Sequence, residues 1–170
     1  ETAQATDTAT QPQTADPSVV TTNGIDGWPQ ASDISSTAAI VMETSTNTVL
    51  YSKNADQALY PASAVKVMTC LVALENSSLD DQVTMTATGV SGVTDGGANI
   101  SSQLDEVFTM EQCLYAIMVA SANDIALQVA EHVGGSVDAF VQTMNARAQE
   151  LGCTNTVFTN PTGLPDENQH

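Results

Sequence analysis

A serine and a lysine three residues apart stand at the start of a strongly apolar stretch of the chain. Residues 60–66 read YPASAVK, and residues 67–75 continue as VMTCLVALE. This stretch has the length and composition of a buried helix, with proline and small residues where a helix begins. The spacing of three places Ser63 and Lys66 on one face of that helix. The rest of the fold must therefore pack around a helix that carries a lysine.

The pair has the chemistry of an activated nucleophile. A serine hydroxyl reacts poorly until a neighbouring group accepts its proton, and a neutral amine can do so. Two features favour a neutral Lys66, namely the nearby positive end of the helix dipole and the apolar sequence on both sides. The same helix end favours negative charge that develops on a substrate oxygen near Ser63.

A simpler interpretation is that Lys66 extends its amine to water, as lysines on helices commonly do. The pattern Ser-x-x-Lys is weak by itself and does not exclude this. Composition argues against it, because the chain has only three basic residues, Lys53, Lys66 and Arg147. One of these three interrupts an otherwise apolar helix, which indicates a specific role for it.

The charge of the chain excludes several classes of partner. Its 170 residues include 20 acidic and 3 basic side chains, a formal net charge of −17. This charge excludes a protein that binds the nucleic-acid backbone and disfavours an anionic membrane surface. No stretch reaches the roughly 20 apolar residues of a membrane span. The spacing of Cys70, Cys113 and Cys153 matches no metal site, so packed free thiols are expected.

The order of the remaining patterns predicts an α+β fold. Residues 1–30 are rich in Thr, Ala and Gln and predict a flexible N-terminal tether, followed by a folded part over residues 31–170. Strands are expected at residues 38–43 and 48–52, joined as a β-hairpin, and at residues 82–86. A hairpin followed by helices, without βαβ alternation, is typical of α+β proteins. The hairpin alone would be marginal, so it requires partner strands, which the sequence does not supply.

Three further helices are predicted after a loop over residues 89–102. A capping box at Thr109 begins the first, which ends near residue 120. The second runs from residue 124 to residue 132 and stops at two glycines, and Ser136 caps the third. The apolar positions expected in the core are Cys113, Leu114, Ile117, Met118, Phe140, Met144, Ala148 and Leu151.

Three patterns occur together in a fixed order: Ser63-x-x-Lys66, Ser121-x-Asn123, and residues 156–166 (TVFTNPTGLPD). With their flanking residues they resemble the serine D-alanyl-D-alanine carboxypeptidases, the low-molecular-mass penicillin-binding proteins of the penicillin-recognising superfamily. The resemblance covers about residue 35 to residue 170. It implies a β-lactamase/transpeptidase-like fold, of which this chain holds the N-terminal hairpin and the helical subdomain.

The resemblance also implies roles for four residues. Ser63 would be the acylated nucleophile and Lys66 its proton acceptor, while Ser121 would relay protons to the leaving group. Asn123 would hold the donor-peptide amide and orient Lys66. The chemistry agrees, because a hydroxyl both donates and accepts, and an amide can serve a lysine and a substrate carbonyl together.

The implied reaction removes the terminal D-alanine from peptidoglycan stem pentapeptides through an acyl-enzyme. It takes place outside the cytoplasm and uses no metal or other cofactor. The implied partners are stem peptides that end in D-Ala-D-Ala, β-lactam antibiotics and the C-terminal remainder of the same protein. Nucleic acid is not among them.

The third motif of this family, Lys-Thr-Gly on a strand after the helical region, is missing from the sequence. Residues 161–163 (PTG) lack the lysine and lie in a stretch with prolines on both sides, which predicts a loop rather than a strand. We therefore expect the chain to be the N-terminal portion of a D,D-peptidase catalytic domain and to be inactive alone.

Three other functions are compatible with parts of the pattern. A β-lactam-binding sensor would use Ser63 and Lys66 without turnover of a peptide. A class A β-lactamase would also need Glu-x-x-Leu-Asn, which residues 150–155 (ELGCTN) do not match. A Ser-His-Asp hydrolase fits poorly, because His132 ends a structural helix and His170 lies in a terminal loop.

Overall fold

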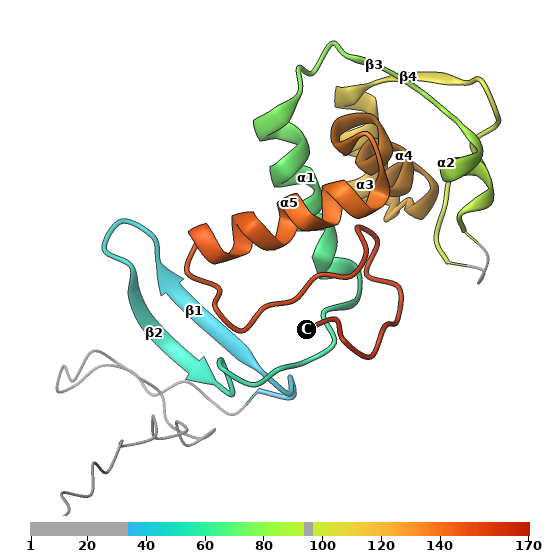
Figure 1. The fold of residues 1–170 in the computed structure, drawn as a ribbon. Coiled ribbons are helices and arrows are strands. Elements are labelled where there is room, and N and C mark those ends of the chain that lie inside the picture. The colour runs from blue at the N-terminus through green and yellow to red at the C-terminus, as the bar shows by residue number, and fades with distance from the viewer. Residues whose placement is uncertain (1–33, 94–96) are drawn as a thin grey trace, which may run out of the picture. The chain divides into compact units, whose positions relative to one another are not determined.

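A computed structural model describes residues 34–93 and 97–170 of the chain (Figure 1). The predicted tether over residues 1–30 lies outside the described residues. The chain divides into two compact units, Glu1–Gln57 and Ala58–His170.

The described part of the first unit is a β-hairpin. Strands β1 (Ala39–Glu43) and β2 (Thr48–Lys53) pair antiparallel, as the sequence predicts. The carboxylate of Glu43 accepts hydrogen bonds from the backbone and hydroxyl groups of Ser45 and Thr46, at 2.6–3.0 Å, and so closes the turn. Within the described residues the hairpin forms a sheet of two strands.

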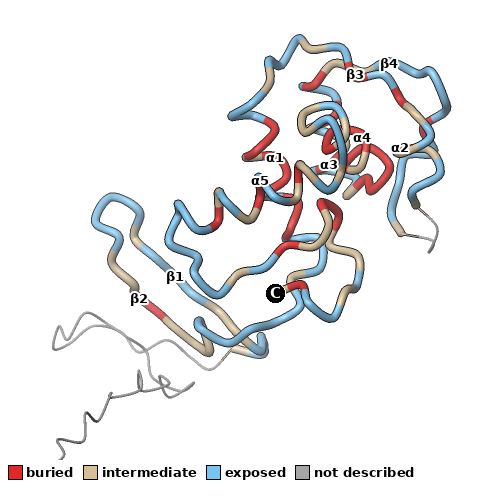
Figure 2. The backbone as a smooth tube through the Cα atoms, in the orientation of Figure 1, coloured by how far each residue is buried: buried red, intermediate tan, exposed pale blue. Residues whose placement is uncertain are grey.

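The second unit is mainly helical, and helix α4 lies at its centre (Figure 1). In chain order its elements are the 3-10 turn η1 (Ala62–Ala64), α1 (Val65–Asn76), β3 (Gln82–Thr84), α2 (Ala87–Ser91), β4 (Val107–Thr109), α3 (Met110–Ala120), α4 (Asn123–Gly134) and α5 (Val137–Glu150). Helix α4 contacts the four other described α-helices, and its residues Ile125, Ala126, Val129 and Ala130 are fully buried (Figure 2). Strands β3 and β4 pair antiparallel in a small separate sheet.

The helix ends follow the local signals in the sequence. The Thr109 hydroxyl accepts from the backbone N–H of Gln112, whose side chain accepts from the backbone N–H of Thr109, so the predicted capping box is confirmed. Gly135 ends α4 in the left-handed region at φ +74°. The Ser136 hydroxyl caps α5 by accepting from the backbone N–H of Ala139.

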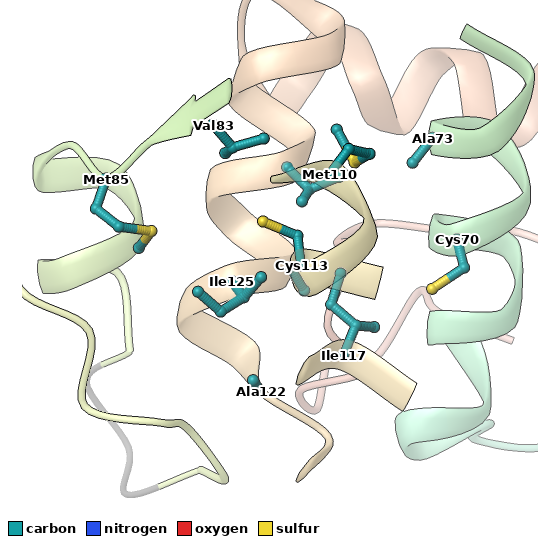
Figure 3. Packing of buried hydrophobic residues seen from close by; sticks show 11 residues of the cluster. Cys70, Ala73, Val83, Met85, Met110, Cys113, Ile117, Ala122 and Ile125 are labelled. Carbon is teal, nitrogen blue, oxygen red and sulfur yellow. The ribbon is translucent and has the colours of Figure 1, made fainter. Parts of the chain in front are cut away.

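Buried side chains form two apolar clusters in this unit. The first, shown in Figure 3, packs α1, α3 and α4 together with the segment around β3. The second packs α1, α4 and α5 around Phe140, which is fully buried, and includes Phe158 of the C-terminal segment. The side chain of Asn145 on α5 bonds both the backbone N–H and the carbonyl of Phe158, each at 2.8 Å. The C-terminal segment is thereby fastened to the helical core.

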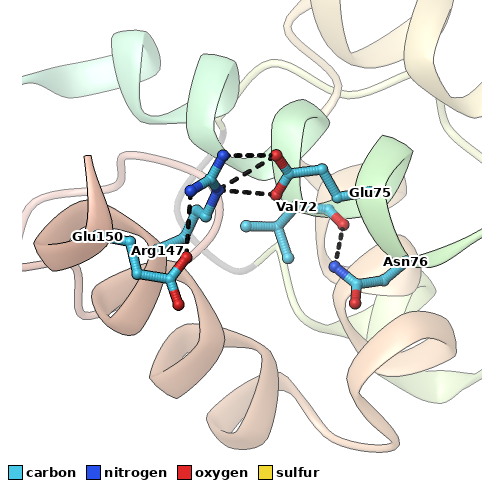
Figure 4. A network of polar contacts seen from close by, with 5 residues as sticks. All are labelled: Val72, Glu75, Asn76, Arg147 and Glu150. Atoms are coloured by element: carbon cyan, nitrogen blue, oxygen red, sulfur yellow. Dashed lines mark hydrogen bonds and ion pairs between the residues drawn. The ribbon is translucent and has the colours of Figure 1, made fainter.

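A charged contact joins the last turns of α1 and α5 (Figure 4). The Arg147 guanidinium donates to both carboxylate oxygens of Glu75, with its shortest contact at 2.8 Å, and also to Glu150 at 3.1 Å. Because these side chains are partly exposed, we expect the contact to fix the relative orientation of the two helices more than to add stability.

Several predictions about individual positions are wrong. Residues 87–91 form α2, although residues 89–102 were expected to be loop. The Thr86 hydroxyl caps this short helix, in a sequence whose Thr and Gly content is more typical of loops. Met118 is 55% exposed, because it follows the buried Ile117 by one position and points off the core face of α3. Leu151 is 50% exposed because α5 ends one residue before it.

All three cysteines are free thiols; Cys70 and Cys113 are buried as predicted, whereas Cys153 is exposed. Among the described residues, no helix combines the length and the apolar character that crossing a lipid bilayer requires.

Candidate active site

Ser63 lies in the 3-10 turn η1, immediately before α1, and it is exposed. The turn is closed by a hydrogen bond from the backbone N–H of Ala64 to the carbonyl of Pro61, at 3.1 Å. The sequence predicts Ser63 in the first helical turn, and the structure places it in this tighter lead-in to the helix. The hydroxyl is therefore open to solvent at a helix start.

Lys66 is buried, with only 3% of its surface exposed. Its amine contacts three oxygen atoms: Ser63 Oγ at 3.3 Å, Asn123 Oδ1 at 2.7 Å and the backbone carbonyl of Thr162. Burial lowers the pKa of Lys66, and the neighbouring Cys70 opposes this shift in part. The direction favours the neutral amine that a proton acceptor requires.

Ser121 and Asn123 reach the pair through the turn between α3 and α4. Ser121 ends α3 in the left-handed region at φ +54°, and its hydroxyl donates to Ser63 Oγ at 3.0 Å. Asn123 begins α4 and is buried. All four predicted site residues are thus brought together, from η1, from α1 and from a turn almost 60 residues later in the chain.

A loop over residues 97–102 covers Asn123. The backbone N–H of Asn123 donates to the carbonyl of Ala98 at 2.8 Å, and Gly97 lies so close that a Cβ there would sit 2.4 Å from Asn123 Nδ2. The buried carboxylate of Asp124 accepts from the backbone N–H and the hydroxyl of Ser102, at 3.1 and 2.8 Å. Asp124 therefore holds the loop against the side chain that contacts Lys66.

The C-terminal loop supplies a contact that the sequence does not predict. Residues 161–163 form a loop, as predicted, and they do not supply the missing lysine. The backbone carbonyl of Thr162 nevertheless accepts a hydrogen bond from Lys66. The Asn-Pro-Thr-Gly sequence signals a turn, but no side-chain pattern marks a backbone carbonyl as part of a site.

The partners of Lys66 determine where its lone pair can point. A neutral amine has two N–H groups, and both the amide oxygen of Asn123 and the carbonyl of Thr162 can only accept. If each takes one N–H, the lone pair faces Ser63, whose hydroxyl then donates to it. Ser121 can still donate to the Ser63 oxygen. The geometry therefore suits proton transfer from Ser63 to Lys66.

A cavity of about 360 Å³ begins next to the serine. It is lined by Tyr60, Pro61, Ala62, Gly163, Leu164, Pro165, Asp166, Glu167 and Gln169. No cluster of three or more His, Cys, Asp or Glu side chains that could hold a metal ion occurs in the described part of the chain.

The fold is that of the penicillin-binding proteins. The D-alanyl-D-alanine carboxypeptidase DacD from Francisella tularensis superposes with a TM-score of 0.78 at 30% sequence identity, over 91% of this chain and 39% of that protein. Penicillin-binding protein 5 from Haemophilus influenzae gives a TM-score of 0.77 at 30% identity, over 84% of this chain and 43% of that one. The α+β, transpeptidase-like fold class predicted from the sequence is confirmed.

The chain belongs to the D-alanyl-D-alanine carboxypeptidase family, peptidase family S11, whose sequence model matches residues 26–170. It is 38% identical to the D-alanyl-D-alanine carboxypeptidase DacF of Bacillus subtilis, over 78% of this chain and 35% of the relative. It is also 31% identical to a D-alanyl-D-alanine endopeptidase of Escherichia coli, over 80% of this chain and 44% of that protein. The chain thus spans less than half the length of these relatives.

Proposed function

We propose that the chain is the nucleophile-bearing part of a serine D-alanyl-D-alanine carboxypeptidase. It would remove the terminal D-alanine from peptidoglycan stem peptides outside the cytoplasm, and β-lactams would acylate it. The observation that carries the proposal is the buried Lys66, whose amine lies 3.3 Å from an exposed serine hydroxyl and is held by two acceptors. Such a contact activates a hydroxyl that would otherwise be a weak nucleophile.

Acylation then proceeds in three proton transfers. Ser63 Oγ attacks the carbonyl carbon between the two D-alanines and gives its proton to Lys66 as the new carbon–oxygen bond forms. The carbon–nitrogen bond breaks, and the departing amine takes a proton from Ser121, which Lys66 replaces. In deacylation, water attacks the ester, passes a proton to Lys66, and the Ser63 oxygen recovers it.

Asn123 contributes binding as well as orientation. Its Oδ1 accepts from Lys66, which leaves the Nδ2 group free to donate to the carbonyl of the donor peptide. Gly97 lies beside this Nδ2 group, and the absence of a Cβ at Gly97 leaves the amide its space. The side chain of Asn123 would therefore position both the donor peptide and Lys66.

The Lys-Thr-Gly strand has to come from elsewhere. We infer that further chain, either continuous with this one or separate, supplies it and completes the sheet. The family draws one donor of its oxyanion hole from that strand, and losing one such donor typically costs about 10²–10³ in rate. The 170-residue chain alone should therefore be essentially inactive.

A second candidate is a D-alanyl-D-alanine endopeptidase, which cleaves within cross-links. The observation that favours it is the 31% identity to the Escherichia coli endopeptidase, over 80% of the chain. The chemistry at Ser63 would be the same, and only the group on the leaving amine would be larger. Parallel assays with a linear and a cross-linked muropeptide distinguish the two.

The test uses a fluorescent penicillin and the completed enzyme, which is this chain together with the further chain that supplies the Lys-Thr-Gly strand. We expect the adduct on Ser63 by peptide mapping, its loss in Ser63→Ala, and no change in Ser77→Ala, a serine beyond the far end of α1. The wild-type enzyme that is labelled on Ser63 should also release D-alanine from a peptide ending in D-Ala-D-Ala. An adduct on Ser121 would contradict the assigned nucleophile, and acylation without peptide turnover would indicate a β-lactam sensor.

A further inference from the structure

The loop that reaches Lys66 is fastened along the first turns of α1. The carbonyl of Pro161 accepts from the Thr69 hydroxyl at 2.7 Å, and the next carbonyl, of Thr162, accepts from Lys66. Thr69 and Thr162 are almost completely inaccessible to solvent. Two successive carbonyls of the loop thus accept hydrogen bonds from two side chains on one face of α1. These contacts fix the position of the loop along the helix axis, next to Lys66.

One side chain shapes this loop. Asn160 Oδ1 accepts three hydrogen bonds, from the backbone N–H of Thr162 at 3.1 Å, from its hydroxyl at 2.8 Å and from the backbone N–H of Gly163 at 2.8 Å. Its Nδ2 group donates across the turn to the carbonyl of Leu164 at 3.1 Å. Asn160 therefore holds the peptide units on both sides of the Thr162 α-carbon, and the second of these units contains the Thr162 carbonyl.

We propose that Asn160 is a positioning residue for the reaction: it holds the turn of residues 160–164 so that the Thr162 carbonyl takes one N–H of Lys66 and leaves the lone pair facing Ser63. Asn160 acts through the Thr162 backbone rather than on substrate. The inference rests on the proposed function, in which Lys66 accepts the Ser63 proton.

The alternative geometry without this turn shows why the contact matters. If the Thr162 carbonyl moves away, one N–H of the buried Lys66 loses its acceptor. A buried unpaired donor is costly, so the amine would rotate and donate to Ser63 instead. Lys66 would then stabilise the hydroxyl in its protonated form, with its lone pair turned away. The amine would remain in place but would no longer act as a base.

The experiment compares the completed wild-type enzyme with Asn160→Ala and Asn160→Asp. We expect Asn160→Ala to lower the rate of acylation by a fluorescent penicillin by about 10²-fold, the effect of a displacement near 1 Å in a reacting group. On a peptide substrate the loss should fall on kcat more than on KM, because the base is misplaced while Asn123 still binds the peptide.

Asn160→Asp separates positioning from general structure. Its carboxylate keeps an acceptor for the three donors, so most of the acylation rate should return at high pH. The added negative charge favours the ammonium form of Lys66, so the rise of rate with pH should move to higher pH. Among the groups that face Lys66, Cys70 is titratable, whereas Ser63, Asn123 and the Thr162 carbonyl are neutral.

Asn145→Ala is the matched control. It also removes an asparagine that fastens the C-terminal segment, but at Phe158 rather than at Thr162. We expect a lower melting temperature with acylation close to wild type. Wild-type acylation rates in Asn160→Ala, or equal losses in Asn145→Ala and Asn160→Ala, would overturn the inference. A wild-type enzyme that penicillin does not label on Ser63 would instead refute the proposed function.

Discussion

In a Gly163→Ala variant, the new Cβ would meet the backbone of the turn η1, which holds Ser63. Built on the present backbone, it would lie 1.9 Å from the carbonyl oxygen of Ala62 and 2.9 Å from the backbone nitrogen of Ser63. Gly163 also has φ +82°, a conformation that other residues rarely adopt. The substitution therefore combines backbone strain with a collision between the new Cβ, whose position the backbone fixes, and the main chain of η1.

The size of the effect follows from these distances. The contact to Ala62 must open from 1.9 Å to at least 3.0 Å, so the loop and the turn must separate by about 1 Å. A left-handed alanine costs roughly 1–2 kcal/mol and overpacking roughly 1–3 kcal/mol, which together lower the free energy of unfolding by roughly 2–5 kcal/mol. A shift of about 1 Å between the Ser63 hydroxyl and the Lys66 amine should also slow acylation by about 10²-fold.

Gly152→Ala isolates the collision from the strain. Gly152 has a similar φ of +85°, but a Cβ there would meet nothing within 4 Å, so it should cost only the roughly 1–2 kcal/mol of backbone strain. Denaturant unfolding and acylation by a fluorescent penicillin, both on the completed enzyme, measure the two effects. If Gly163→Ala matched Gly152→Ala in both measurements, the close approach of the loop to the turn η1 would be refuted.

Three further outcomes are expected of the completed enzyme. Burial lowers the pKa of Lys66, and the proposed mechanism requires its neutral amine. The acylation rate should therefore rise with pH along a limb centred below the ordinary lysine value of about 10.4, and Lys66→Arg should abolish acylation. A limb at the ordinary value would contradict a neutral base. In Gly97→Ala, the new Cβ would lie 2.4 Å from Asn123 Nδ2, which is the end of a side chain, so the melting temperature should stay nearly unchanged. Acylation should nevertheless fall by about 10-fold or more, because Asn123 is displaced. Unchanged acylation kinetics would show that Asn123 tolerates displacement. Phe140→Ala should lower the free energy of unfolding by about 3–5 kcal/mol, because the ring is fully buried. Urea denaturation measures this loss. A loss below about 1 kcal/mol would mean that the second apolar cluster contributes little to stability.

The features that the sequence predicts well are those set by neighbours along the chain. The capping box at Thr109, the glycine that ends α4 and the cap at Ser136 each depend on residues within one turn. The pairing of Ser63 with Lys66 is of the same kind, because a spacing of three on a helix fixes it. Such signals need no knowledge of the tertiary fold.

The features that the sequence does not predict depend on packing between distant segments. The α3–α4 turn reaches Ser63 because α3 and α4 both pack against α1. The residue pattern around Ser121 does not by itself place this residue at the site, and only the family resemblance does so. The carbonyl of Thr162 has no side-chain signature at all. The exposure of Met118 depends on which face of α3 meets the core, and a shift of one position along the helix reverses that assignment.

The partners of Lys66 are spread along the sequence, and this spacing couples reactivity to the order of folding. Ser63 is three residues away, whereas Asn123 and Thr162 follow 57 and 96 residues later. Contacts across such separations form late, because the chain must first close a long loop. During synthesis, the segment that holds Ser63 and Lys66 leaves the ribosome long before residue 162. At that stage we expect the Lys66 amine to be hydrated and the Ser63 hydroxyl to have ordinary reactivity. On the proposed mechanism, Ser63 should become reactive only when the last of these segments has docked.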